Sequence, residues 1–147
     1  MKFTDISSVA HCDCLNDAVE NTTDLFARKV NKSPNLRIQD FRNQIEKGRI
    51  PVNESDCEEV CGLRGVSVDI WTEESQGTIM QKYQNTLKFS PKAKNNVCVV
   101  KFAKDSCLLK YTPYQKPDYN PYHYDLFKED SFSEESMEVV TMVPITL

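Results

Sequence analysis

The sequence is poor in glycine, with only 4 in 147 residues. Glycine-rich loops let a backbone approach phosphate groups closely, so this scarcity argues against a nucleotide-binding loop. The Gly-x-x-x-x-Gly-Lys-Ser/Thr, Gly-x-Gly-x-x-Gly, Gly-x-Ser-x-Gly and His-Glu-x-x-His patterns do not occur either. The enzymes that depend on those four motifs are therefore excluded.

Long apolar runs and an excess of positive charge are also missing. The longest apolar runs cover only a few residues, such as 97–100, so we expect no membrane-spanning segment. A formal charge of -4 disfavours nucleic-acid binding. Asp5 interrupts the only candidate for an apolar signal region. We therefore expect an acidic cytoplasmic protein with reduced cysteines, unless a signal peptide has been removed.

The length of 147 residues, with 39% apolar and 27% charged residues, predicts one globular domain over residues 1–147. Residues 1–65 are expected to be mainly helical, because apolar side chains recur at helical spacing. The first helix is predicted from Leu15, Val19, Phe26 and Val30, and the second from Ile38, Phe41 and Ile45. A third, short helix is expected to begin at Ser55 and end at Gly62.

Residues 66–147 are expected to be rich in strands. Alternation in 66–70 predicts a half-buried strand, and 97–103 and 107–111 are expected to pair as a hairpin. Further strands are expected within 118–127 and over 137–143, the last at a sheet edge because Pro144 follows it. A helix from about Thr78 is expected to bury Ile79, Met80, Tyr83 and Leu87.

These elements predict an α+β fold. A helical N-terminal half would pack on a small mixed or antiparallel sheet that carries one inserted helix. Residues 113–147 contain 2 lysines against 7 acidic residues, so an acidic surface is expected near the C-terminus.

Six cysteines are the main compositional oddity. Four of them form two close pairs, and two such pairs could supply the tetrahedral ligands of a zinc ion. His11 is the alternate ligand if one thiol points away. Buried core thiols and disulfides remain open as alternatives. The candidate metal ligands are Cys12, Cys14, Cys57 and Cys61.

Cys98 and Cys107 differ from these four cysteines. Strand alternation places each on an apolar face with neighbours such as Val100 and Leu109, so both are expected to lie in the core. The predicted hairpin would keep the two thiols too far apart for a disulfide.

Five of the 6 tyrosines fall between positions 111 and 124, together with Pro113, Pro117 and Pro121. Proline restricts the chain, and tyrosine combines an apolar ring with a polar tip that suits interfaces. Two interpretations are open: a docking surface for a protein partner, or a loop folded back as a lid over the sheet. The candidate partner-binding residues are Tyr114, Tyr119, Tyr122 and Tyr124.

His123 and Asp125 lie two residues apart, so on a strand both would face the same side. A base with its orienting partner, or two metal ligands, would need that arrangement. The sequence places no nucleophile beside them. Apart from zinc, no cofactor is expected.

The function we expect is that of a small, non-catalytic binding or regulatory module acting on a protein partner. An accessory subunit, an inhibitor and an immunity-type protein all fit. The alternative is a metal-dependent or cysteine-based enzyme that uses His123 and Asp125.

Overall fold

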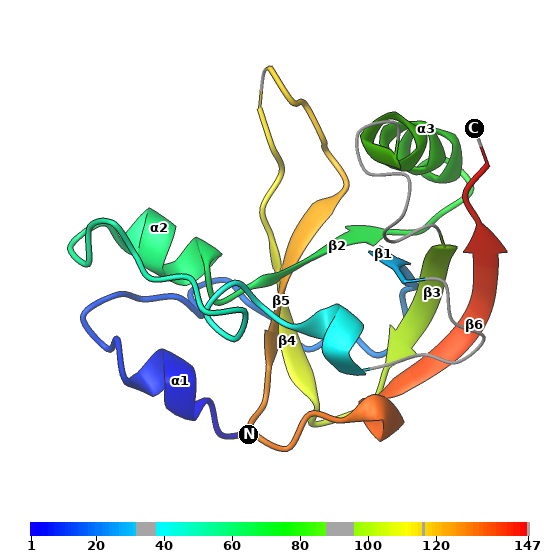
Figure 1. Ribbon diagram of the computed structural model, residues 1–147. Coiled ribbons are helices and arrows are strands. Elements are labelled where there is room, and N and C mark those ends of the chain that lie inside the picture. Colours follow the sequence, from blue (N-terminus) through cyan, green and yellow to red (C-terminus); the bar gives the residue numbers. More distant parts are fainter. Residues whose placement is uncertain (32–37, 88–95, 116, 147) are drawn as a thin grey trace.

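The computed structural model describes residues 1–31, 38–87, 96–115 and 117–146. Its centre is a six-stranded sheet with strand order β4-β5-β2-β1-β3-β6, in which every pair is antiparallel (Figure 1). The strands are β1 (Phe26–Val30), β2 (Val66–Ile70), β3 (Asn96–Phe102), β4 (Cys107–Tyr111), β5 (His123–Lys128) and β6 (Met137–Pro144).

The predicted α+β fold, with a helical N-terminal half packed on a small sheet, is wrong, because the six-stranded sheet makes up most of the structure. Within its described part, residues 1–65 hold only the short helices α1 (Thr4–Ser7) and α2 (Cys57–Gly62) and the 3₁₀ helix η1 (Ile38–Phe41). Together with α3 (Gln76–Leu87) and the 3₁₀ helix η2 (Glu134–Ser136), they only flank the sheet (Figure 1).

β1 shows why the helical spacing misled. Asn21 Oδ1 accepts hydrogen bonds from the amides of Thr23 and Asp24, which forms a turn in the middle of the expected helix. Beyond that turn, Phe26 and Val30 are buried on one face of a strand that pairs with both β2 and β3. The hydrogen-bonded pairing of β1 with a strand on each side therefore outweighs the weak helical pattern of its sequence.

The expected hairpin between 97–103 and 107–111 does not form either. β3 pairs with β1 and β6, whereas β4 leaves it and pairs with β5 at the opposite side of the sheet. Alternation identified both strands correctly, but it carries no information about which strand lies beside which. The apolar run 97–100 is fully buried because β3 is covered on both faces.

Several local predictions are confirmed. Strand 66–70 is present, α2 ends at the expected glycine, and Cys98 and Cys107 are buried free thiols. The last strand lies at a sheet edge and reaches Pro144, as the proline indicated. The helix expected near Thr78 is α3 (Gln76–Leu87), and the side chain of Leu87 lies outside the described part of the chain.

The two faces of the sheet are covered differently. One face carries the larger apolar cluster, which includes Phe26, Cys98 and Cys107. α3 packs on the other face, where Ile79 and Tyr83 meet Ala27 and the odd-numbered residues of β3. The groove and the polar network described below lie on this second face.

Candidate functional site

β4 and β5 are joined by a long connection, and we call its described residues, 112–115 and 117–122, the arm. It extends beyond the ends of both strands towards the end of the molecule that carries α3 (Figure 1). Two backbone hydrogen bonds close its tip, from Tyr114 N to Asn120 O at 3.0 Å and from Asn120 N to Tyr114 O at 2.9 Å. The arm therefore continues β4 and β5 as a hairpin extension, in which Pro113, Pro117 and Pro121 have no amide proton to donate.

A buried polar network anchors the arm to the sheet. Asn120 Nδ2 donates to Oδ1 of Asp69 on β2 at 2.8 Å, and Tyr83 Oη on α3 donates to Oδ2 at 2.5 Å. Asn120 is 3% exposed and Asp69 is 5% exposed, so the carboxylate is satisfied by protein groups alone. Burial, followed by the charge of Asp69, raises the pKa of Tyr83 well above its usual value.

A groove of about 890 Å³ separates the arm from α3. The arm contributes two tyrosine rings, a proline ring and amide groups, and the helix contributes amide, hydroxyl and ammonium groups. These walls offer hydrogen-bond donors and acceptors as well as flat apolar surfaces. The lining residues are Thr78, Ile79, Gln81, Lys82, Asn85 and Thr86 from α3, and Tyr114, Gln115, Pro117, Asp118, Tyr119 and Asn120 from the arm.

The four candidate tyrosines do not form one surface. Tyr119 is 63% exposed at the tip of the arm, and Tyr114 is exposed on one side, so both line the groove. Tyr122 and Tyr124 are half-buried and pack against the clusters on opposite faces of the sheet. The docking interpretation therefore fits Tyr114 and Tyr119, whereas Tyr122 and Tyr124 pack against the sheet, as the lid interpretation expects.

His123 is 2% exposed at the start of β5. Its Nδ1 lies 2.8 Å from the carbonyl oxygen of Thr112 and 2.9 Å from Oγ1 of the same residue. Because a carbonyl oxygen can only accept, we assign the proton to Nδ1. Tyr114 stacks on the ring, with centroids 4.1 Å apart. Burial lowers the pKa of His123, which favours the neutral ring. Nε2 is therefore a buried acceptor, and no group of the described residues donates to it.

Asp125 follows on the same face of β5 but is not joined to His123 by a hydrogen bond among the described residues. It lies against Gly65, where an added Cβ would sit 2.8 Å from Cβ of Asp125, so this position requires glycine. Burial raises the pKa of Asp125 to about 6, although Lys110 and Thr112 oppose the shift. His123 and Asp125 are thus neighbours without forming a base and its orienting partner.

Neither free thiol lies beside His123. Cys98 and Cys107 belong to the cluster on the face of the sheet opposite His123, because Tyr124 and Leu126 of β5 also point into that cluster. Burial raises the pKa of each thiol to about 11, so both are protonated at neutral pH. The cysteine-based enzyme therefore has little support from this geometry.

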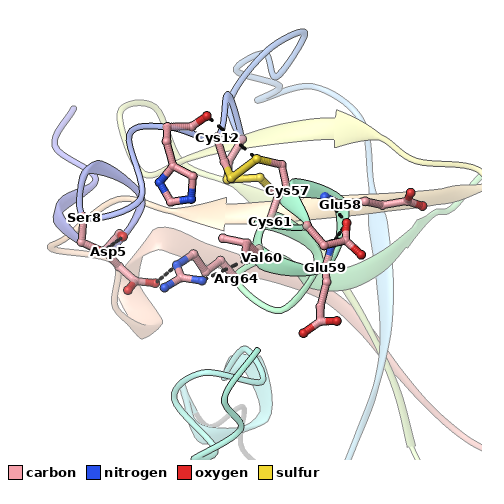
Figure 2. The surroundings of a disulfide bond; sticks show 12 residues. Asp5, Ser8, Cys12, Cys57, Glu58, Glu59, Val60, Cys61 and Arg64 are labelled. Carbon is pink, nitrogen blue, oxygen red and sulfur yellow. Dashed lines mark hydrogen bonds and ion pairs between the residues drawn. A yellow bond between two sulfur atoms is a disulfide. The ribbon is translucent and has the colours of Figure 1, made fainter. Parts of the chain in front are cut away.

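The two cysteine pairs do meet, but as disulfides. Cys12 bonds to Cys57, close to Val60 (Figure 2). Cys14 bonds to Cys61 and belongs to the same buried cluster. α2 presents Cys57 and Cys61 one turn apart on the same side, as their spacing indicated. The expectation of reduced cysteines is wrong for these four.

The zinc hypothesis depends on the oxidation state. His11 lies close to one disulfide, with ligand atoms of His11, Cys12 and Cys57 within 4.8 Å of one another. A disulfide sulfur has no thiolate charge to offer zinc, so the proposed ligand set exists only in a reduced chain. His11 Nε2 instead lies 3.1 Å from the carbonyl oxygen of Glu54. Disulfides are typical of oxidising compartments, and the cytoplasmic location stays a prediction.

The polar network was missed by sequence reasoning. Alternation assigned Asp69 to the polar side of its strand, but α3 covers that side. Tyr83 was correctly expected on the buried face of its helix, and a buried tyrosine usually needs a partner for its hydroxyl. That requirement is the one signal that could have led to Asp69.

No protein-family model matches the chain, no curated protein matches it, and no solved structure matches it. Among the described residues, no helix combines the length and apolar character needed to cross a bilayer. The fold and the site therefore define only a structural class. The protein has an antiparallel sheet, two disulfides that join the N-terminal segment to α2, and a groove between the anchored arm and α3.

Proposed function

We propose that this protein is a small, non-catalytic binding or regulatory module that holds an extended segment of a partner protein in the groove. The observation that carries the proposal is the groove itself, which an anchored hairpin and a helix form together. Because both walls are held in place by Asp69, a segment could bind without first ordering the site.

The chemistry of the walls favours an extended polypeptide. The amides of Gln81, Asn85 and Gln115 can hydrogen-bond the backbone of a segment that has no secondary structure of its own. Tyr114 and Tyr119 offer flat rings against which side chains can pack. Lys82 and Asp118 face the groove from opposite walls, so its charge is mixed and selects neither a strongly basic nor a strongly acidic segment.

The acidic C-terminal segment supports a role in association rates. Its negative charge would steer a partner with a basic surface towards the molecule, whereas the groove would supply the specific contacts. The metal-dependent or cysteine-based enzyme remains the alternative, with less support because no free thiol approaches His123 among the described residues.

Selection of linear peptides from a random display library on the immobilised protein tests the proposal. We expect enriched peptides whose affinity falls at least ~10-fold, or about 1.4 kcal/mol, in Tyr119→Ala. Tyr111→Ala is the matched control, since Tyr111 is an exposed tyrosine at the base of the arm that does not line the groove. Peptides that bind both variants as well as the wild type, or an empty selection, would contradict the proposal.

A further inference from the structure

A second, smaller cavity lies at the inner end of the groove, and we call it the chamber. Its volume is about 220 Å³, which is more than a single water molecule needs. It shares Lys82, Thr86 and Tyr114 with the groove, whereas Lys29 and His123 line only the chamber. The chamber therefore opens where α3 crosses β1, β2 and β5.

His123 contributes an unused acceptor to this chamber. His123 lines the chamber, and its Nδ1 edge is directed at Thr112, so Nε2 is the buried ring nitrogen that is left without a partner. A buried nitrogen without a partner destabilises the fold, and a ligand that donates a hydrogen bond would recover this free energy. The position thus favours a ligand with a donor group.

Two ammonium groups line the same chamber. Nζ of Lys29 lies 5.8 Å from the centroid of the Tyr83 ring, and Nζ of Lys82 lies 5.5 Å from the centroid of the Tyr114 ring. Neither lysine forms an ion pair with a described carboxylate. Burial, followed by the charges of Lys82 and Arg28, lowers the pKa of Lys29. Two like charges held at one cavity favour an anionic ligand.

The other charged groups at the chamber are already compensated. The guanidinium of Arg28 donates to the carbonyl oxygens of Asp40 and Ser67, and the carboxylates of Asp40 and Asp69 lie near it. Both oxygens of Asp69 accept hydrogen bonds from Tyr83 and Asn120. Lys29 and Lys82 therefore remain as the uncompensated charges.

We propose that the chamber binds a phosphate group, either as inorganic phosphate or as a phosphomonoester. The negative oxygens would face Lys29 and Lys82, and one proton would bridge a phosphate oxygen and Nε2 of His123. Near neutral pH a phosphate can carry this proton itself, as hydrogen phosphate does. Sulfate cannot, so it would present a bare oxygen to a nitrogen lone pair.

That difference gives a sharp test, which is to titrate the protein with inorganic phosphate and with sodium sulfate at pH 7.5 and constant ionic strength. Calorimetry would measure the affinity, and backbone amide shifts in NMR spectra would locate the site. We expect saturable binding of one phosphate, with sulfate at least ~10-fold weaker. We expect the preference for phosphate to shrink at lower pH, because a protonated His123 can donate to either anion.

Lys29→Gln and Lys82→Gln should each weaken phosphate binding at least ~10-fold, whereas Lys101→Gln, a lysine of β3 that does not line the chamber, should leave it unchanged. His123→Phe should abolish the preference for phosphate over sulfate. Because that variant removes the hydrogen bond from Nδ1 to the carbonyl oxygen of Thr112, the two lysine variants provide the independent readout if it does not fold.

The source of the phosphate can be distinguished with a third ligand. A phosphoserine peptide that binds at least ~10-fold tighter than inorganic phosphate would assign the chamber to a modified side chain of a segment in the groove. Equal affinities would assign it to a free phosphate or small phosphomonoester. Equal binding of phosphate and sulfate, or no saturable phosphate binding below ~10 mM, would overturn the proposal.

Discussion

Asn120 donates a hydrogen bond from Nδ2 to Oδ1 of Asp69 at 2.8 Å and so joins the arm to β2. The two residues are 51 positions apart, and both are almost completely buried. This contact holds one wall of the groove, and it also determines how the arm lies against α3, because Tyr83 binds the other oxygen of the same carboxylate.

Asn120→Ala should lower the free energy of unfolding by about 1–3 kcal/mol, because a buried carboxylate oxygen loses its donor. Amide hydrogen exchange should also become faster at Tyr114, whose amide bonds to Asn120. Urea denaturation and exchange measured by NMR check these expectations. Asn85→Ala, at an exposed site on the opposite wall, is the control. Unchanged exchange in the arm would show that the anchor is not needed.

Two tyrosine variants should separate surface from core. Tyr124 packs edge-on against Phe26, with ring centroids 5.4 Å apart, so Tyr124→Ala should destabilise the protein by about 2–4 kcal/mol. Tyr119 is largely exposed, so Tyr119→Ala should change stability by less than about 0.5 kcal/mol. Urea denaturation of both variants gives the comparison, and similar losses would place Tyr119 in a packed lid.

The two disulfides should overlap in their effect on stability. They close loops of nearly the same length, with separations of 45 and 47 residues. Because either bond alone restrains the unfolded chain, replacing Cys14 and Cys61 by serine should cost only about 2 kcal/mol, and replacing all four cysteines about 5 kcal/mol. Urea denaturation with and without reductant measures both losses. Reductant should not affect the four-serine variant, which serves as the control.

Alkylation followed by intact mass measurement should count the thiols directly. In the folded, non-reduced protein we expect no adduct, because Cys98 and Cys107 are buried. Denaturation without reductant should expose these 2 thiols, and reduction should expose all 6 cysteines. Four or more adducts without reductant would contradict the disulfides and would return the four cysteines to the zinc hypothesis.

Asp125 should make the protein less stable as the pH rises from about 4 to about 6. Its pKa is raised to about 6, so within this interval the folded chain binds more protons at Asp125 than the unfolded chain does. Asp125→Asn should therefore increase the free energy of unfolding at pH 7 by up to about 3 kcal/mol and flatten the dependence on pH. Denaturation at a series of pH values tests this.

The control for that series is Asp118→Asn, which removes an exposed carboxylate from the arm. A wild-type stability that rises between pH 4 and pH 6, or that keeps its slope in Asp125→Asn, would show that the buried carboxylate does not titrate as described.

Elements with one dominant pattern were predictable from the sequence. The alternation of 66–70 and the apolar face of α3 were identified because each pattern matches the period of its own structure. The helices expected before Gly48 were wrong because their patterns were short. There, long-range pairing of β1 decided the structure.

The candidate site was predictable only in part. The Tyr/Pro segment was identified, and two of its four candidate tyrosines line the groove. The buried residues Asp69 and Asn120 were missed, because the sequence does not show whether a single polar side chain faces solvent or is covered by another element. The cysteine pairs were recognised as neighbours, but their bonding was not.

By itself, the sequence determined most of the strands after residue 65, the helix with an apolar face and where the last strand stops, since these follow from the local period of side chains and from proline. Only the tertiary structure decided the order of the strands, the disulfide bonding of the cysteine pairs and the burial of Asp69 beneath α3. These features depend on contacts between residues far apart in the chain, and the free energy of such contacts exists only once both partners are in place.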